Sequence, residues 1–240
     1  MTESEPVSSR RTWIRIATYN IHQCVGMDGR RDVDRIAAVI REMDADIVGL
    51  QEVDSDPAGF RDSKQMDYLA SLTGYEAVPG FTIMNSDRHY GNVLLSRFPI
   101  VAARSEDLSI SGHEPRAAID AEVRVLGNRV RVVVTHLGLK LRERRDQTAY
   151  LLDAIEPGPM PTVLLGDLNE WIPLFGTGRR FRERFGHRHH PRSFPVCCPF
   201  IPLDRIHCEP DALLADTWAH RTALSRVASD HLPVVAAFYP

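Results

Sequence analysis

Several features that would assign this chain to a protein class directly are scarce or missing. Cysteine is rare, and the four that are present are too unevenly spaced for a disulfide scaffold: Cys24, Cys197, Cys198 and Cys208. No apolar run approaches the length of a membrane-spanning helix, and the sequence contains no repeat or low-complexity segment. The net charge is −3, so no general positive field attracts nucleic acids or membranes, and any phosphate recognition must be local.

The N-terminal residues are not expected to form an export signal. Arg10 and Arg11 resemble the start of a twin-arginine signal, but such a signal continues with an apolar stretch. Residues 13–20 instead alternate between apolar and polar side chains, which is typical of a strand. With no oxidising address, we expect reduced cysteines and a cytoplasmic protein.

The hydrophobic pattern predicts an α/β protein. Residues 13–20 and 47–52 are predicted strands, and residues 33–43 between them have the apolar spacing of a helix. A strand, helix and strand in this order form a right-handed crossover between parallel strands. Asn20 and Glu52 are therefore expected to end their strands at the same edge of a sheet.

Further short strands follow along the chain, and Gly127-Asn128 is a strong signal for a hairpin between two of them. These strands are predicted at residues 91–96, 100–103, 117–126, 129–137, 162–165, 203–208, 213–218 and 233–239, with helices at 66–73 and 142–155. Residues 171–202 are basic, proline-rich and without a regular pattern. About ten short strands with a few helices favour two packed sheets with helices outside.

Polar residues stand where many of these strands end. After the buried strand 162–165, Asp167 and Asn169 lie two residues apart, so their side chains lean the same way in extended backbone. A carboxylate that can accept a proton then lies beside an amide that can hold a water. An ordinary turn also uses Gly, Asp and Asn, but other strand ends carry similar residues. The whole strand-end set is Asn20, Glu52, His136, Asp167, Asn169, Asp204, Asp230 and His231.

This combination of residue types suits phosphate chemistry. Carboxylates that converge with neutral amides make an oxygen-ligand site for Mg²⁺, with Mn²⁺ as a substitute, whereas zinc would prefer more imidazole or thiolate. Histidines with carboxylate partners can donate to a phosphoryl oxygen or act in acid–base steps. The set therefore predicts metal-assisted hydrolysis of a phosphate ester.

The sequence resembles the metal-dependent endonuclease/exonuclease/phosphatase superfamily, which includes deoxyribonuclease I-like nucleases, inositol-polyphosphate phosphatases and sphingomyelinases. The resemblance spans residues 13–240, and its motifs occur in the family's order at residues 18–22, 50–54, 91–97, 135–137, 166–169, 203–206 and 229–233. It implies a four-layer α/β/β/α sandwich of two packed mixed sheets. Residues 13–240 would form a single catalytic domain, and residues 1–12 are expected to be a disordered tail.

The resemblance also implies a metal site and a site for the attacking water. Glu52 would be the principal metal ligand, with Asn20 and Asp230 helping. Asp167 would orient or deprotonate the attacking water, and Asn169 would hold a water or a phosphate oxygen.

Further roles concern the scissile phosphate. His231 would contact it and be fixed by Asp204, and His136 would stabilise charge on the phosphoryl oxygens. His22 is a departure, because nucleases of the family often have a second acid two residues after the Asn. It either alters the metal site or packs in the turn. Arg116 either contacts phosphate or ties loops together.

The substrate stays open at the level of sequence. Residues 192–195 and 203–206 resemble small bacterial family members, some suspected of acting on lipid head groups, which favours a phospholipid head group or a small phosphodiester. A DNA or RNA nuclease is the alternative, although a duplex-binding nuclease usually has more positive charge. A non-catalytic phosphate-binding protein is the alternative of another class, but it is expected to have lost Asp167, Asn169 or His231. No protein partner is predicted.

Arginines and histidines gather at residues 179–192. They are interpreted as a mobile basic lip that attracts an anionic substrate, or as an ordinary solvated loop. The histidines and cysteines in and after this segment match no common zinc-site spacing: His187, His189, His190, Cys197, Cys198, His207 and Cys208.

Overall fold

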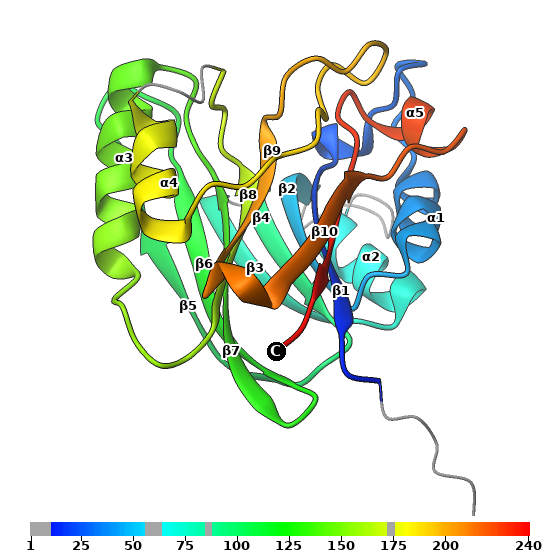
Figure 1. Ribbon diagram of the computed structural model, residues 1–240. Helices are drawn as coiled ribbons and strands as arrows, with labels where there is room; N and C mark the ends of the chain where they lie inside the picture. The colour runs from blue at the N-terminus through cyan, green and yellow to red at the C-terminus, as the bar shows by residue number, and fades with distance from the viewer. Residues whose placement is uncertain (1–10, 56–63, 85–87, 172–175) are drawn as a thin grey trace, which may run out of the picture.

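Two β-sheets lie between two groups of helices in this protein (Figure 1). The computed structural model describes residues 11–55, 64–84, 88–171 and 176–240, so the predicted N-terminal tail lies almost entirely outside the described residues. The strands are β1 Ile14–Asn20, β2 Ile47–Ser55, β3 Glu76–Met84, β4 His89–Ser96, β5 Ile100–Asp107, β6 Ala117–Val125, β7 Asn128–His136, β8 Thr162–Asp167, β9 Asp204–Glu209, β10 Leu214–Ala219 and β11 Val234–Phe238. The helices are α1 Val33–Met43, α2 Gln65–Thr73, α3 Leu141–Ala154, α4 Thr177–Phe185 and α5 Ser225–Ala228, with short 3₁₀ turns η1 His22–Cys24 and η3 Asp211–Leu213.

Each sheet contains one parallel pair of strands. Within the described ranges, the first sheet has the order β10-β11-β1-β2-β4-β3 and the second has the order β5-β6-β7-β8-β9. β1 and β2 are parallel and are connected through α1, as predicted, and β7 and β8 are parallel and are connected through α3. Because parallel strands end at the same edge of a sheet, the segments that follow these four strands gather at one end of the molecule.

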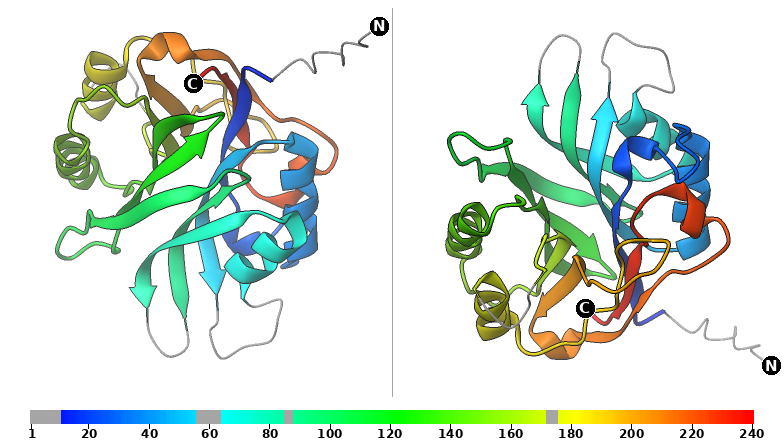
Figure 2. Two further views of the ribbon diagram at one scale, coloured as in Figure 1. Left: turned by 90° about the horizontal axis from the view of Figure 1, so that it is seen from below. Right: turned by 90° about the horizontal axis from the view of Figure 1, so that it is seen from above.

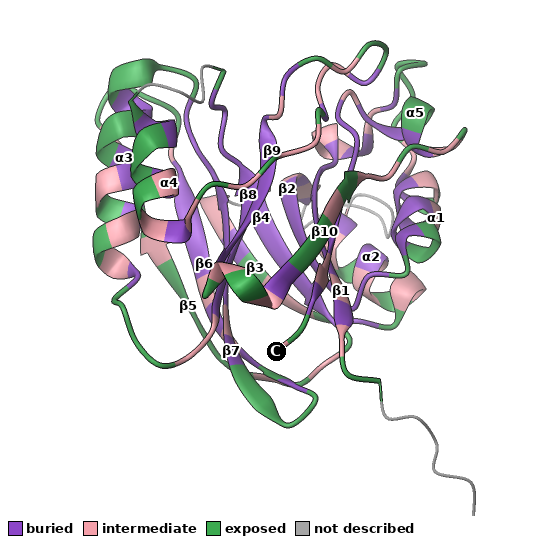
Figure 3. Cartoon of the chain, viewed as in Figure 1, coloured by how far each residue is buried: buried purple, intermediate pink, exposed green. Residues whose placement is uncertain are grey.

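Three layers of apolar side chains separate four layers of backbone, which confirms the predicted α/β/β/α sandwich. Ile40 of α1 packs on Leu50 of β2 in the first core. Val132 of β7 lies in the second core between the sheets, whereas its neighbour Val133 faces Leu151 of α3 in the third. The two groups of helices cover the outer faces of the sheets (Figure 2). The central strands are therefore buried on both faces, whereas much of the edge strands β3, β5 and β10 is exposed or half-buried (Figure 3). In the part of the chain that the structure describes, no helix is long and apolar enough to cross a membrane.

β3 is a strand that the sequence pattern does not predict, and α4 contradicts the prediction of an irregular segment at residues 171–202. β3 contains Pro79 and Gly80 and pairs only with β4 at the edge of its sheet, where a missing backbone N–H is tolerated. α4 lies within the segment that we predicted to be irregular. Its only fully buried apolar side chains, Phe181 and Phe185, are four residues apart and pack on the third core. The helix therefore depends on tertiary packing rather than on an apolar stripe.

The predicted hairpin between β6 and β7 is present, but its turn is displaced by one residue. Val125 pairs with Asn128, so the turn is formed by Leu126 and Gly127, which both have positive φ angles of 50° and 93°. Two consecutive positive φ values are typical of a type I′ turn, whose twist matches that of the strands. Asn128 is the first residue of β7 and not part of the turn.

Two histidines pack together beside α4: His207 of β9 is buried, and His190 is partly exposed. The ring of His207 stacks on Phe181 with centroids 5.4 Å apart and meets the ring of His190 at 4.6 Å. His207 Nε2 and His190 Nδ1 have no hydrogen-bond partner within the described residues. Burial lowers the pKa of both rings, that of His190 to about 3. Both are therefore neutral in the folded protein.

Replacing His207 with Phe is expected to make the fold less sensitive to acid. Below the ordinary histidine pKa of 6.5, the unfolded chain binds a proton at His207 that the folded chain does not bind. The contribution of the neutral His207 to the free energy of unfolding is therefore complete above pH 6.5 and is lost as the pH falls. At pH 5 the loss is about 2 kcal/mol for such a histidine. Urea unfolding at pH 7.5 and pH 5 measures how much free energy of unfolding is lost in acid, and this loss should be smaller in His207→Phe than in the wild type by about that amount. His113→Gln, at an exposed site, is the control. Equal acid losses in His207→Phe and the wild type would contradict the expectation.

Candidate active site

Asn20 connects two carboxylates from different sheets. It ends β1, beside Gln51 of the parallel strand β2. Its Nδ2 donates to Glu52 Oε1 at 3.0 Å and to Asp167 Oδ2 at 3.2 Å, while its Oδ1 accepts from the backbone N–H of His22 at 3.0 Å. The amide is therefore held in one orientation and presents its hydrogens to the two acids. This contact joins β2 to the end of β8 across the interface between the sheets. Glu52 was expected to end its strand, but it lies inside β2, which continues to Ser55 because Val53, Asp54 and Ser55 also pair with β4.

Glu52 is displaced from the regular strand. The pairing of β2 with β4 shifts between Leu50 and Val53, and Glu52 has a φ of 57°. Positive φ in a residue with a β-carbon costs about 1–3 kcal/mol and is found where the surrounding structure imposes it, often at functional sites. Burial raises the pKa of Glu52, and the negative charges of Asp230 and Asp167 raise it further. Its carboxylate thus lies in a partly desolvated cluster of acids.

His136 and Asp167 come together because β7 and β8 end side by side. They are paired residues in the parallel ladder, and His136 Nε2 lies 3.7 Å from Asp167 Oδ2. The strands approach closely just before these residues. A β-carbon at Gly166 would lie 2.1 Å from the backbone oxygen of Thr135, so only glycine fits there.

Donors lie beside both ring nitrogens of His136: Arg116 Nη1 is 3.2 Å from Nδ1, and Asn169 Nδ2 is 3.1 Å from Nε2. A neutral imidazole has a single acceptor nitrogen, so it can accept from only one of these two donors. Burial and then the charge of Arg116 lower the pKa of His136 to about 3. The ring is therefore neutral at physiological pH, with Nε2 on the side of Asp167. Arg116 is itself buried, and its Nε has no partner among the described residues.

Asn169 completes the loop after β8. Its backbone N–H donates to Asp167 Oδ1 at 2.9 Å, which fixes the second oxygen of that carboxylate. Asn169 has a φ of 49°, which asparagine adopts more readily than most residues. Its Nδ2 donates to the Leu137 carbonyl at 2.8 Å and lies 3.1 Å from His136 Nε2. The predicted pair of Asp167 and Asn169 therefore has a defined shape.

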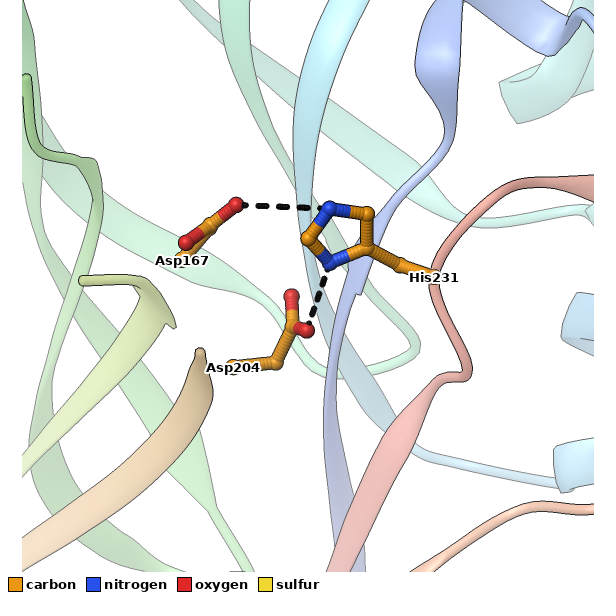
Figure 4. Close-up of side chains that lie close together, drawn as sticks. All are labelled: Asp167, Asp204 and His231. Carbon is orange, nitrogen blue, oxygen red and sulfur yellow. Dashed lines mark hydrogen bonds and ion pairs between the residues drawn. The ribbon is translucent and has the colours of Figure 1, made fainter. Parts of the chain in front are cut away.

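His231 lies between two aspartates (Figure 4). Its Nδ1 is 2.8 Å from Asp204 Oδ2, and its Nε2 is 3.8 Å from Asp167 Oδ2. Burial alone would lower the pKa of His231, but the charge and hydrogen bond of Asp204, followed by Asp167 and Asp230, raise it to about 10. The ring is thus cationic at neutral pH. Asp204 is buried and contacts His231 rather than forming only an ion pair with its neighbour Arg205.

The remaining predicted residues, Asp230 and His22, lie at the open side of the cluster. Their side chains are partly exposed and 3.8 Å apart. Ser229, which carries no predicted role, is fully buried, and its Oγ donates to the backbone oxygen of Asn20 at 2.8 Å. It holds the Asp230–His231 segment against the end of β1. In the sequence, only the position of Ser229 directly before Asp230 indicates this supporting role.

The cluster has ligands suited to a hard divalent cation. Burial and the charges of Asp230 and Asp167 destabilise the Glu52 carboxylate, and a cation among these oxygens would relieve that repulsion. The ligand atoms of Asp167, Asp204 and His231 also lie within 4.8 Å of one another. In that group, however, the hydrogen bond between Asp204 and His231 already engages two of the atoms.

The basic segment 179–192 is more ordered than a mobile lip. Arg184 pairs with Glu209, and Arg188 is held by Asp211 and by backbone carbonyls of η3 and β10. Arg192 differs, because it is exposed and makes no hydrogen bond or ion pair with any residue in the described ranges. Arg184 and Arg188 therefore fix the structure, whereas Arg180, like Arg192, is exposed and has no hydrogen-bond or ion-pair partner among the described residues.

Comparison with known proteins agrees with this geometry. The sequence profile of the Endonuclease/Exonuclease/phosphatase family matches residues 17–231. YbhP of Escherichia coli is 29% identical over 260 residues, which cover 98% of this chain and 99% of YbhP. An endonuclease/exonuclease/phosphatase from Beutenbergia cavernae is similar in structure, with a TM-score of 0.73 and 26% identity over 95% of this chain and 72% of that one. The mannosyl-6-phosphatase Bt3783 of Bacteroides thetaiotaomicron shares the fold, with a TM-score of 0.72 and 18% identity over 93% of this chain and 98% of that one.

Proposed function

Because the chain belongs to the endonuclease/exonuclease/phosphatase family and is therefore a hydrolase of phosphate esters, we propose that its strand-end cluster cleaves a phosphodiester by attack of water on phosphorus. A bond forms between the water oxygen and phosphorus while the bond from phosphorus to the leaving oxygen breaks. The observation that carries the proposal is the meeting of Glu52, Asp167 and His231, which come from distant parts of the chain.

Asp167 takes the proton from the attacking water. One of its oxygens accepts from the Asn169 N–H and the other from Asn20 Nδ2, so the carboxylate is oriented before substrate binds. A positioned base of this kind contributes about 10²–10⁴-fold to a rate. Asn169 lies next to the same carboxylate and holds the water or a phosphate oxygen.

The two histidines act on the phosphoryl oxygens in different charge states. His231 is cationic, and because Asp204 holds Nδ1, the proton on Nε2 is free to reach the phosphate. His136 is neutral, and we assign its proton to Nε2, with Nδ1 accepting from Arg116, the charged one of its two donor neighbours. One charged and one neutral donor stabilise the charge that develops on the oxygens as the bond to the leaving group breaks. Arg116 thus acts through His136.

Glu52, Asp230 and Asn20 are the proposed residues that hold a divalent cation, with Mg²⁺ preferred and Mn²⁺ as a substitute. When bound, the cation screens the phosphate charge and polarises the phosphoryl oxygens. His22, 3.8 Å from Asp230, lies where it can contact substrate beside this site.

Chelation is expected to abolish hydrolysis of bis-p-nitrophenyl phosphate, and added Mg²⁺ or Mn²⁺ should restore it. Glu52→Gln should raise the Mg²⁺ concentration for half-maximal rate by about 10–100-fold, because a neutral amide replaces the charged ligand. Glu156→Gln, at an exposed position just after α3, is the matched control. Full activity in EDTA, or an unchanged Mg²⁺ requirement in Glu52→Gln, would contradict the proposed metal site.

The substrate class that we propose is a lipid head group or another small phosphodiester. The arginines around the site support this choice, because Arg116, Arg144 and Arg205 are buried and bonded within the protein. A nuclease instead needs a track of free cations along the nucleic-acid backbone. Plasmid DNA, RNA and a panel of phospholipids should be compared at one Mg²⁺ concentration. Efficient nicking of DNA with no turnover of phospholipids or small diesters would argue against this class.

A further inference from the structure

A cavity of about 760 Å³ lies outside the catalytic cluster and is not used in the proposed mechanism. Its walls are formed mainly by flat rings and apolar side chains: Trp171, His189, His190, Phe200, Ile201 and Pro202. Pockets with such walls bind the non-reacting parts of small ligands.

A chain of aromatic contacts joins this cavity to the catalytic histidine. The ring of Trp171 meets the ring of Phe194 edge to face at 6.0 Å, and Phe194 lies 4.7 Å from the ring of His231. Trp171 also follows Asn169 by two residues, so the loop after β8 contributes both to the reacting centre and to the cavity wall. The cavity is therefore adjacent to the position at which the scissile phosphate would lie.

Both walls are fixed to the catalytic loops. In the segment 192–202, Phe194 and Ile201 pair as strand residues, and the backbone of Val196 donates to Asp230 at 2.7 Å. Ser193 accepts from the Leu232 N–H at 2.9 Å. The segment is thus bonded on both sides of His231.

The opposite wall is held by a buried arginine. Arg205 Nη2 donates to the Glu170 carbonyl at 2.8 Å, directly before Trp171, and its Nε donates to the Pro202 carbonyl at 2.9 Å. One guanidinium therefore bridges the loop after β8 and the segment 192–202. The two walls are held together and do not depend on a ligand for their position.

The cavity exposes aromatic surface and positive charge. Trp171 is 48% exposed and Phe200 is 59% exposed. Arg192 lines the cavity and has no hydrogen-bond or ion-pair partner in the described residues, whereas Arg188 is engaged with Asp211. Exposed rings gain from stacking on a flat group, and the cation at the same cavity disfavours a positively charged group such as a quaternary ammonium.

We propose that this cavity is a substrate subsite that binds an uncharged or anionic ring attached to the phosphate held at His231. The proposal rests on the phosphoesterase site described above. Trp171 and Phe200 stack on the ring, and Arg192 favours oxygen-rich or anionic substituents on it. The ester recognised best is then a phosphate that carries an aromatic or sugar-like ring.

The test compares phenyl phosphate with methyl phosphate, which differ in the ring and share the phosphate. Both are measured as competitive inhibitors of bis-p-nitrophenyl phosphate hydrolysis in Mg²⁺. Phenyl phosphate should bind about tenfold more tightly in the wild-type protein, as expected for one stacked ring. In Trp171→Ala and in Phe200→Ala this preference should fall to about one- to threefold, with little change for methyl phosphate. Trp218→Ala, at a partly exposed tryptophan on β10, is the matched control and should keep the preference.

Direct binding gives a second readout. The protein has three tryptophans, so the double variant Trp13→Phe, Trp218→Phe leaves Trp171 as the only one. Phenyl phosphate should change its fluorescence and methyl phosphate should not. Equal inhibition by the two phosphates, or an unchanged preference in both alanine variants, would overturn the subsite while hydrolysis continues. Absence of hydrolysis together with no fluorescence response to phenyl phosphate would overturn the proposed function as well.

Discussion

Asp167→Asn is expected to lower kcat for bis-p-nitrophenyl phosphate by about 10³-fold while the protein stays folded. An amide has nearly the same shape as the carboxylate but cannot accept the proton of the attacking water. Turnover at saturating Mg²⁺ and substrate measures the loss, and KM should change much less than kcat. Asp216→Asn on β10, at an exposed aspartate, is the matched control and should retain wild-type activity.

The same substitution also has a structural effect that must be separated from the chemical one. Both oxygens of Asp167 accept hydrogen bonds, one from Asn169 and one from Asn20. The asparagine amide that replaces this carboxylate has one acceptor oxygen instead of two, so one of these donors loses its partner at a cost of about 1–3 kcal/mol. The thermal midpoint should therefore fall by a few degrees, which circular dichroism measures. A folded variant with kcat within threefold of wild type would remove Asp167 from the mechanism.

The hydrophobic pattern of the sequence predicts those helices and strands in which buried side chains recur at the regular spacing of the element. Residues 33–43 show an apolar helical face, and α1 has the predicted bounds. The crossover rule predicts that Asn20 and Glu52 lie at the same edge of a sheet, and the hydrogen bond between them agrees with that topology. β3 and α4 escaped prediction for the opposite reason. Pro79 and Gly80 interrupt the strand pattern, and α4 is a helix because Phe181 and Phe185 reach a core formed by distant segments.

For the candidate site, the sequence indicated which residues end strands but not how their protons are arranged. The charge difference between His136 and His231 depends on Arg116 beside one ring and Asp204 beside the other, contacts that span 20 and 27 residues. The positive φ of Glu52 results from a bulge in pairing with β4, which no local motif specifies. Such features are set by tertiary packing, and sequence spacing carries little information about them.

Asp204 is expected to act entirely through His231, and a double-mutant cycle tests this. His231→Ala should lower kcat/KM by about 10³–10⁴-fold, and Asp204→Asn by about 10²–10⁴-fold, because the ring loses its orientation and tautomer. The double variant should be no less active than His231→Ala alone, since Asp204 has no other task once the imidazole is absent. The cycle of His231→Ala with Asp216→Asn, whose sites are not in contact, serves as the control.

Measurements on the same variants also distinguish two possible roles of Asp204, which are to position the ring of His231 and to bind the metal ion. If Asp204 were instead a metal ligand in the group with Asp167 and His231, its loss would raise the Mg²⁺ concentration needed for half-maximal rate. If it positions the ring, Asp204→Asn leaves the Mg²⁺ concentration for half-maximal rate unchanged, in contrast to Glu52→Gln. The 2.8 Å contact between Asp204 and His231 Nδ1 favours the second outcome, because that oxygen is already used by the imidazole. A Mg²⁺ requirement raised in Asp204→Asn as it is in Glu52→Gln would assign Asp204 to the metal.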